Sequence, residues 1–386
     1  MRQTSSSLPL LTAGFVTVLV GFTSSAAIVF QAATAAGATP GQLASWMWAL
    51  GMGMGLTCIG LSLRYKNPVV TAWSTPGAAL LAGSLQGIPM GEAIAAFMFC
   101  AALITLSGIT GWFERIMSRI PLPIAAAMLA GVLARFGINI FTEMQGQFTL
   151  VFAMFIAYLI CKRFWPRYAI MMVLALGIAI AAGQGLLHIK EVNIAFAKPE
   201  FMMPVFNWQT MLSIGVPLFV VTMASQNMPG VAVIRANGYN TPISPLISWT
   251  GITTLLLAPF GCFSLNLAAI TSAICMGKEA HEDPAQRFKA SIAAGCFYLL
   301  LGVFGATIGA LFTAFPKALV LAIAGLALLG TIANSLSTAM SDEQIREPAL
   351  VTFLVTLSGI SLLGIGAAFW GLIAGAIAIL IMKKNL

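Results

Sequence analysis

Long apolar runs separated by short polar stretches extend along the whole chain. A helix needs about 20 apolar residues to cross a hydrocarbon core roughly 30 Å thick, and most of the runs approach that length. The first run is too long for the apolar region of a signal peptide, about 7–15 residues, so it predicts a membrane span. Hydropathy alone allows twelve to fourteen spans. The fourteen apolar segments cover residues 8–31, 41–63, 67–86, 92–113, 120–141, 147–161, 168–187, 209–234, 242–258, 259–277, 288–312, 316–339, 348–366 and 367–382.

The charged residues are few, and their placement sets the number and orientation of the spans. Only 8% of the 386 residues are charged and 59% are hydrophobic, whereas a soluble domain carries about 25% charged residues. A soluble enzyme, a nucleic-acid-binding protein and a disordered chain are therefore excluded. With fourteen spans and both termini in the cytoplasm, 15 of the 19 Lys and Arg residues lie inside, as the positive-inside rule requires. The four on the opposite side are Arg135, Lys190, Lys198 and Lys317.

An internal repeat divides the chain into two halves, residues 1–200 and 201–386. The string P-V-V-T-A-W-S-T-P-G-A-A at 68–79 matches P-F-G-C-F-S-L-N-L-A-A at 259–269, and further matches follow in the same order. Each half holds seven spans. Because seven is odd, the second half enters the membrane from the opposite face, which predicts two inverted repeats in an all-α polytopic membrane protein.

Two segments, in spans 3 and 10, break the pattern of a continuous membrane helix. Pro68 and Pro76 flank a β-favouring V-V-T-A-W, and Ser74 or Thr75 before Pro76 is typical of a helix N-cap. The following ten or so residues make about 15 Å of helix, half of the bilayer core. The second half has a similar half-helix after Asn266. Two helix N-termini facing one point would bind an anion, although kinks packed against neighbouring helices without a ligand are the alternative.

Polar residues at the same depth extend this candidate site. Gln226 and Asn227 lie in T-M-A-S-Q-N-M-P-G at 222–230, and Ser24 lies in the equivalent stretch of the first half. Amides in the membrane need partners, so they either contact substrate or join helices through hydrogen bonds. Phe22 and Trp73 would add an apolar wall.

Several kinds of chemistry have no candidate residues in this sequence. No Asp or Glu falls at mid-membrane, the six cysteines form no C-x-x-C pair, and two histidines make no zinc site. Hydrolase and ATP-binding motifs are also missing. We therefore expect a protein that is not an enzyme and carries no cofactor and no metal. The glycines in G-M-G-M-G at 51–55, with Gly302, Gly305 and Gly309, predict close helix packing.

Three strings together carry a family resemblance: T-A-W-S-T-P-G-A-A-L at 71–80, T-M-A-S-Q-N-M-P-G at 222–230 and F-S-L-N-L-A-A-I-T-S at 263–272. They resemble the bacterial benzoate transporter family, the benzoate:proton symporters of the inner membrane. The resemblance extends over essentially the whole chain. That family is related to the nucleobase and sulfate carriers, whose fold has seven plus seven inverted spans.

The resemblance implies two domains that combine both halves. A core domain would take residues of about 8–113 and 209–312, and a gate domain those of about 114–190 and 313–382. Carriers of this fold are often dimers, so a homodimer is compatible with the resemblance. Lipid, a small aromatic carboxylate and the proton are the implied partners, and nucleic acid is not one.

The chain departs from its nucleobase-carrying relatives at the substrate site. Those relatives use acidic residues at positions matching Ser225 or Gln226 and Leu265 or Asn266, where this chain has no carboxylate. An anionic aromatic acid suits such a site, whereas a nucleobase does not. The proton would then travel on the substrate's carboxyl group or through water. The expected substrate-binding residues are Phe22, Ser24, Trp73, Ser74, Thr75, Ser225, Gln226, Asn227, Ser264 and Asn266.

The expected function is therefore proton-coupled uptake of benzoate or a similar aromatic monocarboxylate across the bacterial inner membrane. Two alternatives stay open at this point. One is a carrier of the same fold for another organic anion or an uncharged aromatic solute. The other is a passive anion channel, in which flux would neither saturate nor depend on pH.

Overall fold

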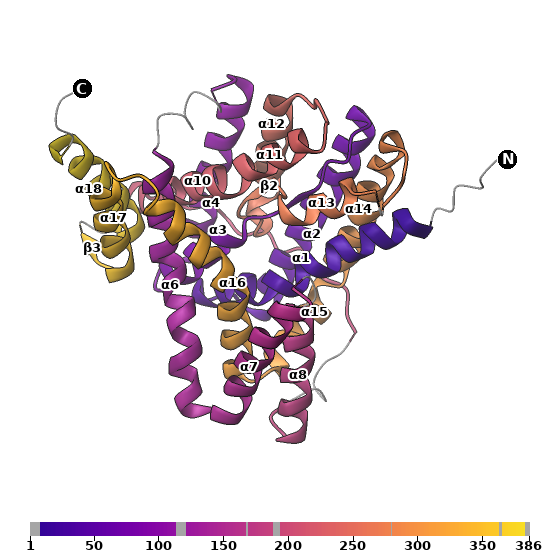
Figure 1. The fold of residues 1–386 in the computed structure, drawn as a ribbon, viewed down its shortest axis with the longest axis horizontal. Helices are drawn as coiled ribbons and strands as arrows, with labels where there is room; N and C mark the ends of the chain where they lie inside the picture. The colour runs from indigo at the N-terminus through magenta and orange to yellow at the C-terminus, as the bar shows by residue number, and fades with distance from the viewer. Residues whose placement is uncertain are drawn as a thin grey trace.

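Helices make up most of the molecule, shown in Figure 1 as a computed structural model. The structure describes residues 8–112, 121–166, 169–187, 194–278, 280–362 and 365–382. The elements before residue 200 are α1 (Leu8–Ala35), α2 (Pro40–Tyr65), β1 (Thr71–Trp73), α3 (Thr75–Ser84), α4 (Met90–Ile109), α6 (Leu122–Gly146), α7 (Phe148–Phe164) and α8 (Ala169–Gly183).

The second half begins with a long helix made of several segments. They are α9 (Trp208–Thr210), a π-helical turn (Met211–Gly215), α10 (Val216–Thr222), a second π-helical turn (Met223–Asn227) and α11 (Met228–Ala236). The later elements are α12 (Ile243–Leu257), β2 (Leu265–Leu267), α13 (Ile270–Met276), α14 (Phe288–Val303), α15 (Gly305–Ala314), α16 (Lys317–Ala339), α17 (Arg346–Ser358), β3 (Ser361–Leu362), β4 (Ile365–Gly366) and α18 (Ala367–Met382). Short 3₁₀ turns cover Ala258–Phe260 and Pro284–Gln286.

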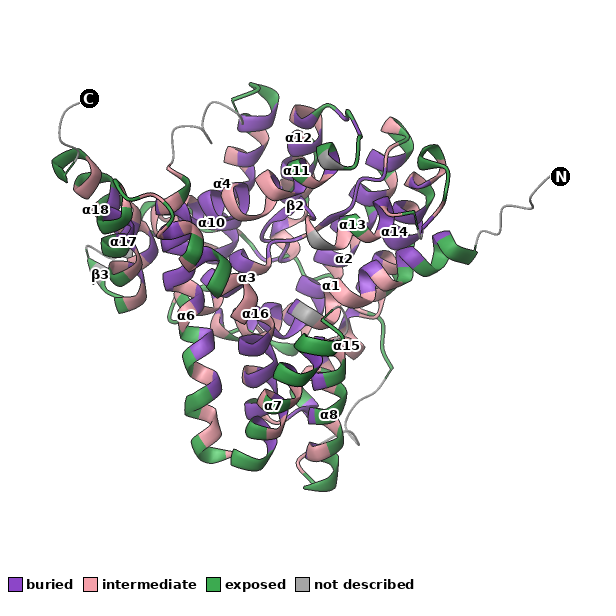
Figure 2. Cartoon of the chain, viewed as in Figure 1, coloured by how far each residue is buried: buried purple, intermediate pink, exposed green. Residues whose placement is uncertain are grey.

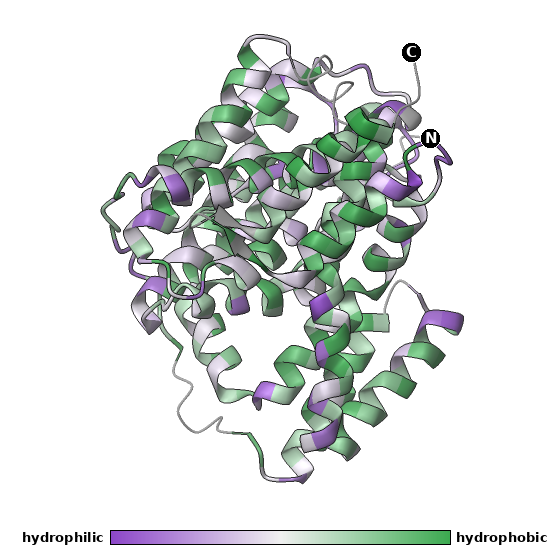
Figure 3. Cartoon of the chain, turned by 90° about the vertical axis from the view of Figure 1, so that its left-hand side faces the viewer, coloured by the Kyte–Doolittle hydropathy of each residue, from purple (hydrophilic) through white to green (hydrophobic). Residues whose placement is uncertain are grey.

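The length and hydropathy of these helices fit a membrane protein. Among the described residues, six helices are long and apolar enough to cross a bilayer, or up to eight if each of two bent helix pairs is one span. Hydrophobic residues run along most of the helices, as Figure 3 shows. The fourteen-span inverted topology is a finer statement and stays a prediction.

Two predicted spans differ from the structure in their details. The segment 288–312, expected to be one helix, bends by 66° between α14 and α15. Gly305 starts the second piece, and the close approach of its backbone to Ala44 and Trp48 leaves no room for a side chain. The half-helix expected directly after Asn266 is also shorter than predicted, because residues 265–267 form a strand and α13 begins only at Ile270.

The predicted glycine contacts between helices are confirmed for α2 and α14. A Cβ atom added to Gly51 would lie 2.5 Å from the Cα atom of Gly302, and one added to Gly55 would lie 2.8 Å from the Gly295 carbonyl oxygen. The two helix backbones are therefore in direct contact, as small residues permit in membrane proteins.

Burial separates a packed centre from an apolar periphery. Figure 2 shows buried residues around α3, α10 and β2, whereas α7, α8, α17 and α18 carry many exposed residues. The exposed side chains on these outer helices include large apolar ones, such as Phe148, Leu159 and Leu380. Apolar residues at the surface in this number need lipid rather than water around them.

The glycine contact between α2 and α14 predicts a position-specific loss of stability. Gly51→Ala places a methyl group against the backbone of Gly302, and overpacking of this kind costs about 1–3 kcal/mol. Gly60→Ala on the same helix is the matched control, because a Cβ at Gly60 meets nothing within 4 Å. In detergent, thermal unfolding should occur at a lower temperature in Gly51→Ala and be unchanged or slightly higher in Gly60→Ala. Equal melting temperatures for the two variants would contradict the packing assignment.

Candidate functional site

Two short strands pair at the centre of the molecule (Figure 1). β1 and β2 run antiparallel, with Ala72 opposite Asn266 and Trp73 opposite Leu265. The pairing continues beyond both strands, since the Ser74 N–H donates to the Ser264 carbonyl oxygen at 3.0 Å. Segments almost 200 residues apart in the sequence therefore meet through their main chains.

Local sequence explains why α3 begins beside this strand pair. Ser74 is extended and its hydroxyl oxygen accepts a hydrogen bond from the Gly77 N–H at 3.1 Å, so of the two predicted candidates, Ser74 and Thr75, Ser74 is the N-cap. Pro76, in the first turn, has no N–H to leave unpaired. A second N–H group of the first turn is also satisfied, because the Ala78 N–H donates to the Ser74 carbonyl oxygen. The first turn of α13 has no side-chain cap.

Three hydroxyl groups join the end of α10 to the residues just before α3 and β2. Thr222 Oγ1 donates to Ser74 Oγ at 3.1 Å and shares a hydrogen bond of 3.0 Å with Ser264 Oγ. All three side chains are completely buried. Sequence reasoning named Ser74 and Ser264 but missed Thr222, although it begins the polar string at 222–230. Buried hydroxyl groups satisfied by one another hold these segments in a fixed arrangement.

Asn227 supports β2 from the side. Its Oδ1 atom accepts a hydrogen bond from the Leu267 N–H at 2.9 Å, and its Nδ2 atom lies 3.1 Å from the Met223 sulfur. The side chain is fully buried. In this conformation Asn227 therefore satisfies the backbone of a strand rather than facing open space.

Asn266 is the opposite case, a buried amide without a partner. Neither its nitrogen nor its oxygen makes a hydrogen bond in the described part of the chain, and its side chain is completely buried. It lies opposite Ala72, and directly opposed residues of an antiparallel pair point to the same face. Ala72 lines the large cavity described next. Burying an amide without a hydrogen-bond partner destabilises the fold, so this position beside a cavity points to a role other than stability.

A cavity of about 1370 Å³ lies against the strand pair and receives four of the expected site residues. Trp73 and Thr75 reach it from β1 and α3, and Ser225 and Gln226 reach it from the π-helical turn before α11. The volume exceeds the roughly 300–1,000 Å³ of a typical ligand pocket, so the cavity includes an open path as well as a site.

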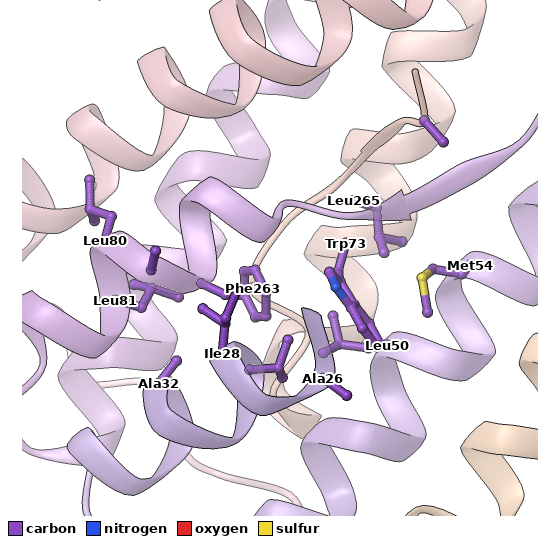
Figure 4. Packing of buried hydrophobic residues seen from close by; sticks show 14 of the residues in the cluster. Ala26, Ile28, Ala32, Leu50, Met54, Trp73, Leu80, Leu81, Phe263 and Leu265 are labelled. Carbon is purple, nitrogen blue, oxygen red and sulfur yellow. The ribbon is translucent and has the colours of Figure 1, made fainter. Parts of the chain in front are cut away.

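The indole of Trp73 is fixed at this cavity. Its Nε1–H donates to Ser25 Oγ at 2.8 Å, and its ring lies 5.5 Å from that of Phe22, measured between centroids. Sequence reasoning chose Ser24 in this stretch, whose side chain lies outside the described residues, and did not choose Ser25. Figure 4 shows Trp73 beside its strand partner Leu265, in the buried cluster that also holds Phe263.

The expected site residues thus fall into two groups. Trp73, Thr75, Ser225 and Gln226 line the cavity, and Phe22 packs on Trp73. A second group is fully buried behind the cavity wall and comprises Ser74, Asn227, Ser264 and Asn266.

The cavity wall contains one charged side chain among the described residues, that of Lys162 at the end of α7. No Asp or Glu in the described chain lines it. The described residues contain no group of three or more His, Cys, Asp or Glu that could hold a metal ion. The arrangement suits reversible binding of an uncharged or anionic molecule with an apolar body.

Comparison with known families decides the identity of the chain. Its residues 4–381 match the family described as "Benzoate membrane transport protein". The chain belongs to this family. Two curated relatives agree with the assignment over nearly their full lengths. The "Inner membrane protein YdcO" of Escherichia coli (strain K12) is 50% identical over 383 residues, which are 99% of this chain and 98% of the relative.

The second relative carries the family description in its own name. The "Benzoate membrane transport protein" of Acinetobacter baylyi is 43% identical over 378 residues, covering 98% of this chain and 96% of that protein. The resemblance found in the three sequence strings is thereby confirmed. The chain is a member of a membrane transport family.

Solved structures with low sequence identity share the fold. An SLC26A9 structure aligns with a TM-score of 0.62 at 12% identity, covering 98% of this chain and 66% of that one. The transmembrane domain of the cyanobacterial bicarbonate transporter BicA aligns with a TM-score of 0.60 at 13% identity, over 96% and 98% of the two chains. This benzoate-family member therefore has an SLC26-type helical membrane fold.

The buried hydroxyl cluster predicts a stability difference between two conservative changes. Thr222→Val keeps the shape of the side chain but removes its hydroxyl, leaving Ser74 and Ser264 with unmet hydrogen bonds at a cost of about 1–3 kcal/mol. Thr222→Ser keeps the hydroxyl and loses only a methyl group. Thermal unfolding in detergent should rank wild type above Thr222→Ser and Thr222→Ser above Thr222→Val. A Thr222→Val protein more stable than Thr222→Ser would show that the hydrogen bonds do not matter.

Proposed function

We propose that this protein takes up benzoate or a similar aromatic monocarboxylate across the bacterial inner membrane, coupled to protons. Membership of the benzoate transport family supports the substrate class, as does the name of the relative at 43% identity. The name of the relative at 50% identity supports the location.

The observation that carries this proposal is the chemistry of the large cavity. An aromatic side chain, Trp73, borders it beside the start of α3, and polar groups from Thr75 and Gln226 border the same region. The single charge among the described lining residues is positive. A carboxylate lining the cavity would repel an anionic substrate, and here none does. An apolar ring and a carboxylate in one small molecule match these surroundings.

In the proposed binding mode the carboxylate lies between the facing ends of α3 and α13, near Thr75. The partial positive charge of a helix N-terminus favours an anion there. The aromatic ring lies against Trp73, which Phe22 and Ser25 hold in place, and Gln226 supplies an amide contact. If the strand pair moves so that the Asn266 side chain enters the cavity, its amide would bind the substrate and would no longer lack a hydrogen-bond partner. Ser24, Ser225, Ser74, Asn227 and Ser264 complete the set expected from the sequence.

Two cavities at opposite ends of the same helices support alternating access. The large cavity includes Leu8 of α1, Leu122 of α6 and Thr338 of α16, each near one end of its helix. A second cavity of about 940 Å³ includes Ala35, Glu143 and Lys317, near the other ends of the same three helices. With both termini in the cytoplasm, the large cavity opens inward. The substrate would cross by passing from one cavity to the other.

The proposed topology assigns these helices to two moving bodies. The inverted repeats, residues 1–200 and 201–386, give fourteen spans, with half-helices in spans 3 and 10. The antiparallel strand pair is what two inverted half-spans would produce at their meeting point. A core domain of about 8–113 and 209–312 carries Trp73 and Gln226, and it moves against a gate domain of about 114–190 and 313–382. A homodimer is compatible with this arrangement.

No described Asp or Glu lines the large cavity, so the described lining residues offer no carboxylate to carry the proton. We therefore place the proton on the substrate's own carboxyl group or on water.

Uptake into proteoliposomes tests the proposal directly. Purified protein should accumulate radiolabelled benzoate when the outside is more acidic than the inside, and a protonophore should abolish the accumulation. No gradient-dependent accumulation above that of empty liposomes would refute proton-coupled uptake. Saturation of the initial rate separates a carrier from a channel, and competition by other carboxylates and by uncharged aromatic compounds identifies the preferred substrate.

Gln226 provides a residue-level test. Gln226→Ala removes a polar group from the cavity wall, and loss of a hydrogen bond to a charged ligand costs about 1.5–3 kcal/mol. The affinity for benzoate, measured by titration calorimetry on purified protein, should fall by about tenfold or more. Gln184→Ala is the control, because Gln184 is exposed and outside the cavity. Equal affinities in both variants and the wild type would move the binding site elsewhere.

A further inference from the structure

One face of α16 presents a row of polar side chains to the large cavity. Thr331, Asn334, Ser335 and Thr338 all line it. Residues spaced by three, four and seven positions share one face of a helix. The row extends from the middle of α16 to one residue before its end at Ala339.

These four side chains have no partners within the described part of the protein. None of them makes a hydrogen bond to a described residue, although Ser335 is only 7% exposed. Elsewhere the same residue types bond back to the preceding turn, as Thr23 does to Leu19 at 2.7 Å and Thr105 to Ala101 at 2.7 Å. The donors on this face of α16 are therefore available to a ligand.

A positive charge lies on the wall of the same cavity. Lys162 is in the last turn of α7, a helix that packs against α16. The neighbouring Arg163 does not line the cavity, and its guanidinium lies 5.5 Å from the ring centroid of Phe164. An ammonium group on a cavity wall attracts a carboxylate from a distance, and neutral donors on that wall can bind it through hydrogen bonds.

We propose that the polar face of α16 forms a second, weaker binding subsite for the carboxylate of the substrate, and that the charge of Lys162, elsewhere on the wall of the same cavity, attracts the anion toward it. This subsite lies between the strand pair and the mouth of the cavity. It receives an organic monocarboxylate that leaves Trp73 and Gln226, and it replaces the hydrogen bond from Gln226 before the anion reaches bulk water. The inference rests on the proposed function, because it concerns the same substrate on its way to the cytoplasm.

The position of the subsite gives it a one-sided effect. Substrate arriving from the cytoplasmic face meets Lys162 and α16 before Trp73, whereas substrate arriving from outside meets them only after the protein has opened inward. Removing the subsite should therefore weaken the apparent affinity for substrate supplied at the cytoplasmic face much more than for substrate supplied at the outer face.

The first experiment compares two changes on α16. Asn334→Ala combined with Ser335→Ala removes two donors from the cavity, whereas Ser337→Ala changes an exposed residue of the same helix that does not line it. Initial rates of [¹⁴C]benzoate transport are measured in inside-out and right-side-out membrane vesicles. The double variant should raise the half-saturating concentration about five- to tenfold in inside-out vesicles and less than twofold in right-side-out vesicles. Ser337→Ala should match wild type in both.

The second experiment removes the charge and keeps the proposal testable if the double variant does not fold. Lys162→Gln and Arg163→Gln change the net charge equally at neighbouring positions. Lys162→Gln alone should raise the half-saturating concentration about two- to fivefold in inside-out vesicles at low ionic strength. The difference should shrink at about 1 M salt, where screening extends over only about 3 Å.

The outcomes separate this inference from the proposed function. Wild-type protein that transports no benzoate in either vesicle type refutes the proposed function. Wild-type transport combined with unchanged kinetics in both cavity variants refutes the subsite alone. An equal effect on both faces, or an effect of Arg163→Gln as large as that of Lys162→Gln, also refutes it.

Discussion

The main-chain pairing of β1 with β2 is the interaction on which the rest of the structure depends. A membrane interior offers no water to unpaired N–H and C=O groups, so an interrupted helix is stable there only if protein supplies the partners. Here the two interruptions supply them to each other, with Ser74 bonded to Ser264 and Ala268 to Val70. Because these groups are satisfied, α3 and α13 can begin in the centre of the protein and not at its surface.

The same pairing divides the polar residues around it into supporting and cavity-lining groups. Thr254 and Asn227 each accept a hydrogen bond from the backbone of β2, and Thr222 bridges two serines. Trp73, Thr75 and Gln226 are left facing open space. A rigid layer behind a ligand site fixes the positions of the residues in front of it, which favours selective binding. Asn266 belongs to neither group, since its amide is buried without a partner in the described chain.

Sequence reasoning succeeded where a feature depends on neighbouring residues. The Ser74 cap with Pro76 and the extended V-V-T-A-W segment follow from local conformational preferences, and both are in the structure. It also selected four residues that line the cavity. It could not distinguish Gln226 from the adjacent Asn227, because both lie in one polar string. Their separation depends on the direction of each side chain in a helix with a π-helical turn.

Features that depend on distant segments were harder to predict. Thr222 matters because Ser74 and Ser264, far away in the sequence, meet beside it. The polar face of α16 could not be recognised from its own sequence, because it lines a cavity whose other walls include α1, α3 and the turn before α11. The late start of α13 results from strand pairing, a tertiary contact that overrides helix propensity for residues 265–267.

The π-helical turn at Met223–Asn227 has a consequence for how this protein can change. Pro229 has no N–H to donate to the turn before it, and the wider turn places one extra residue just ahead of that proline. Deleting one residue here would restore an ordinary helix with the flanking segments in about the same orientation, because the wide turn absorbs one extra residue, but it would change the directions of the side chains within the turn. Gln226 could then not face the cavity while Asn227 supports β2. The length of this segment is therefore constrained, and new substrate preferences can arise here by exchange of side chains but not by insertion or deletion.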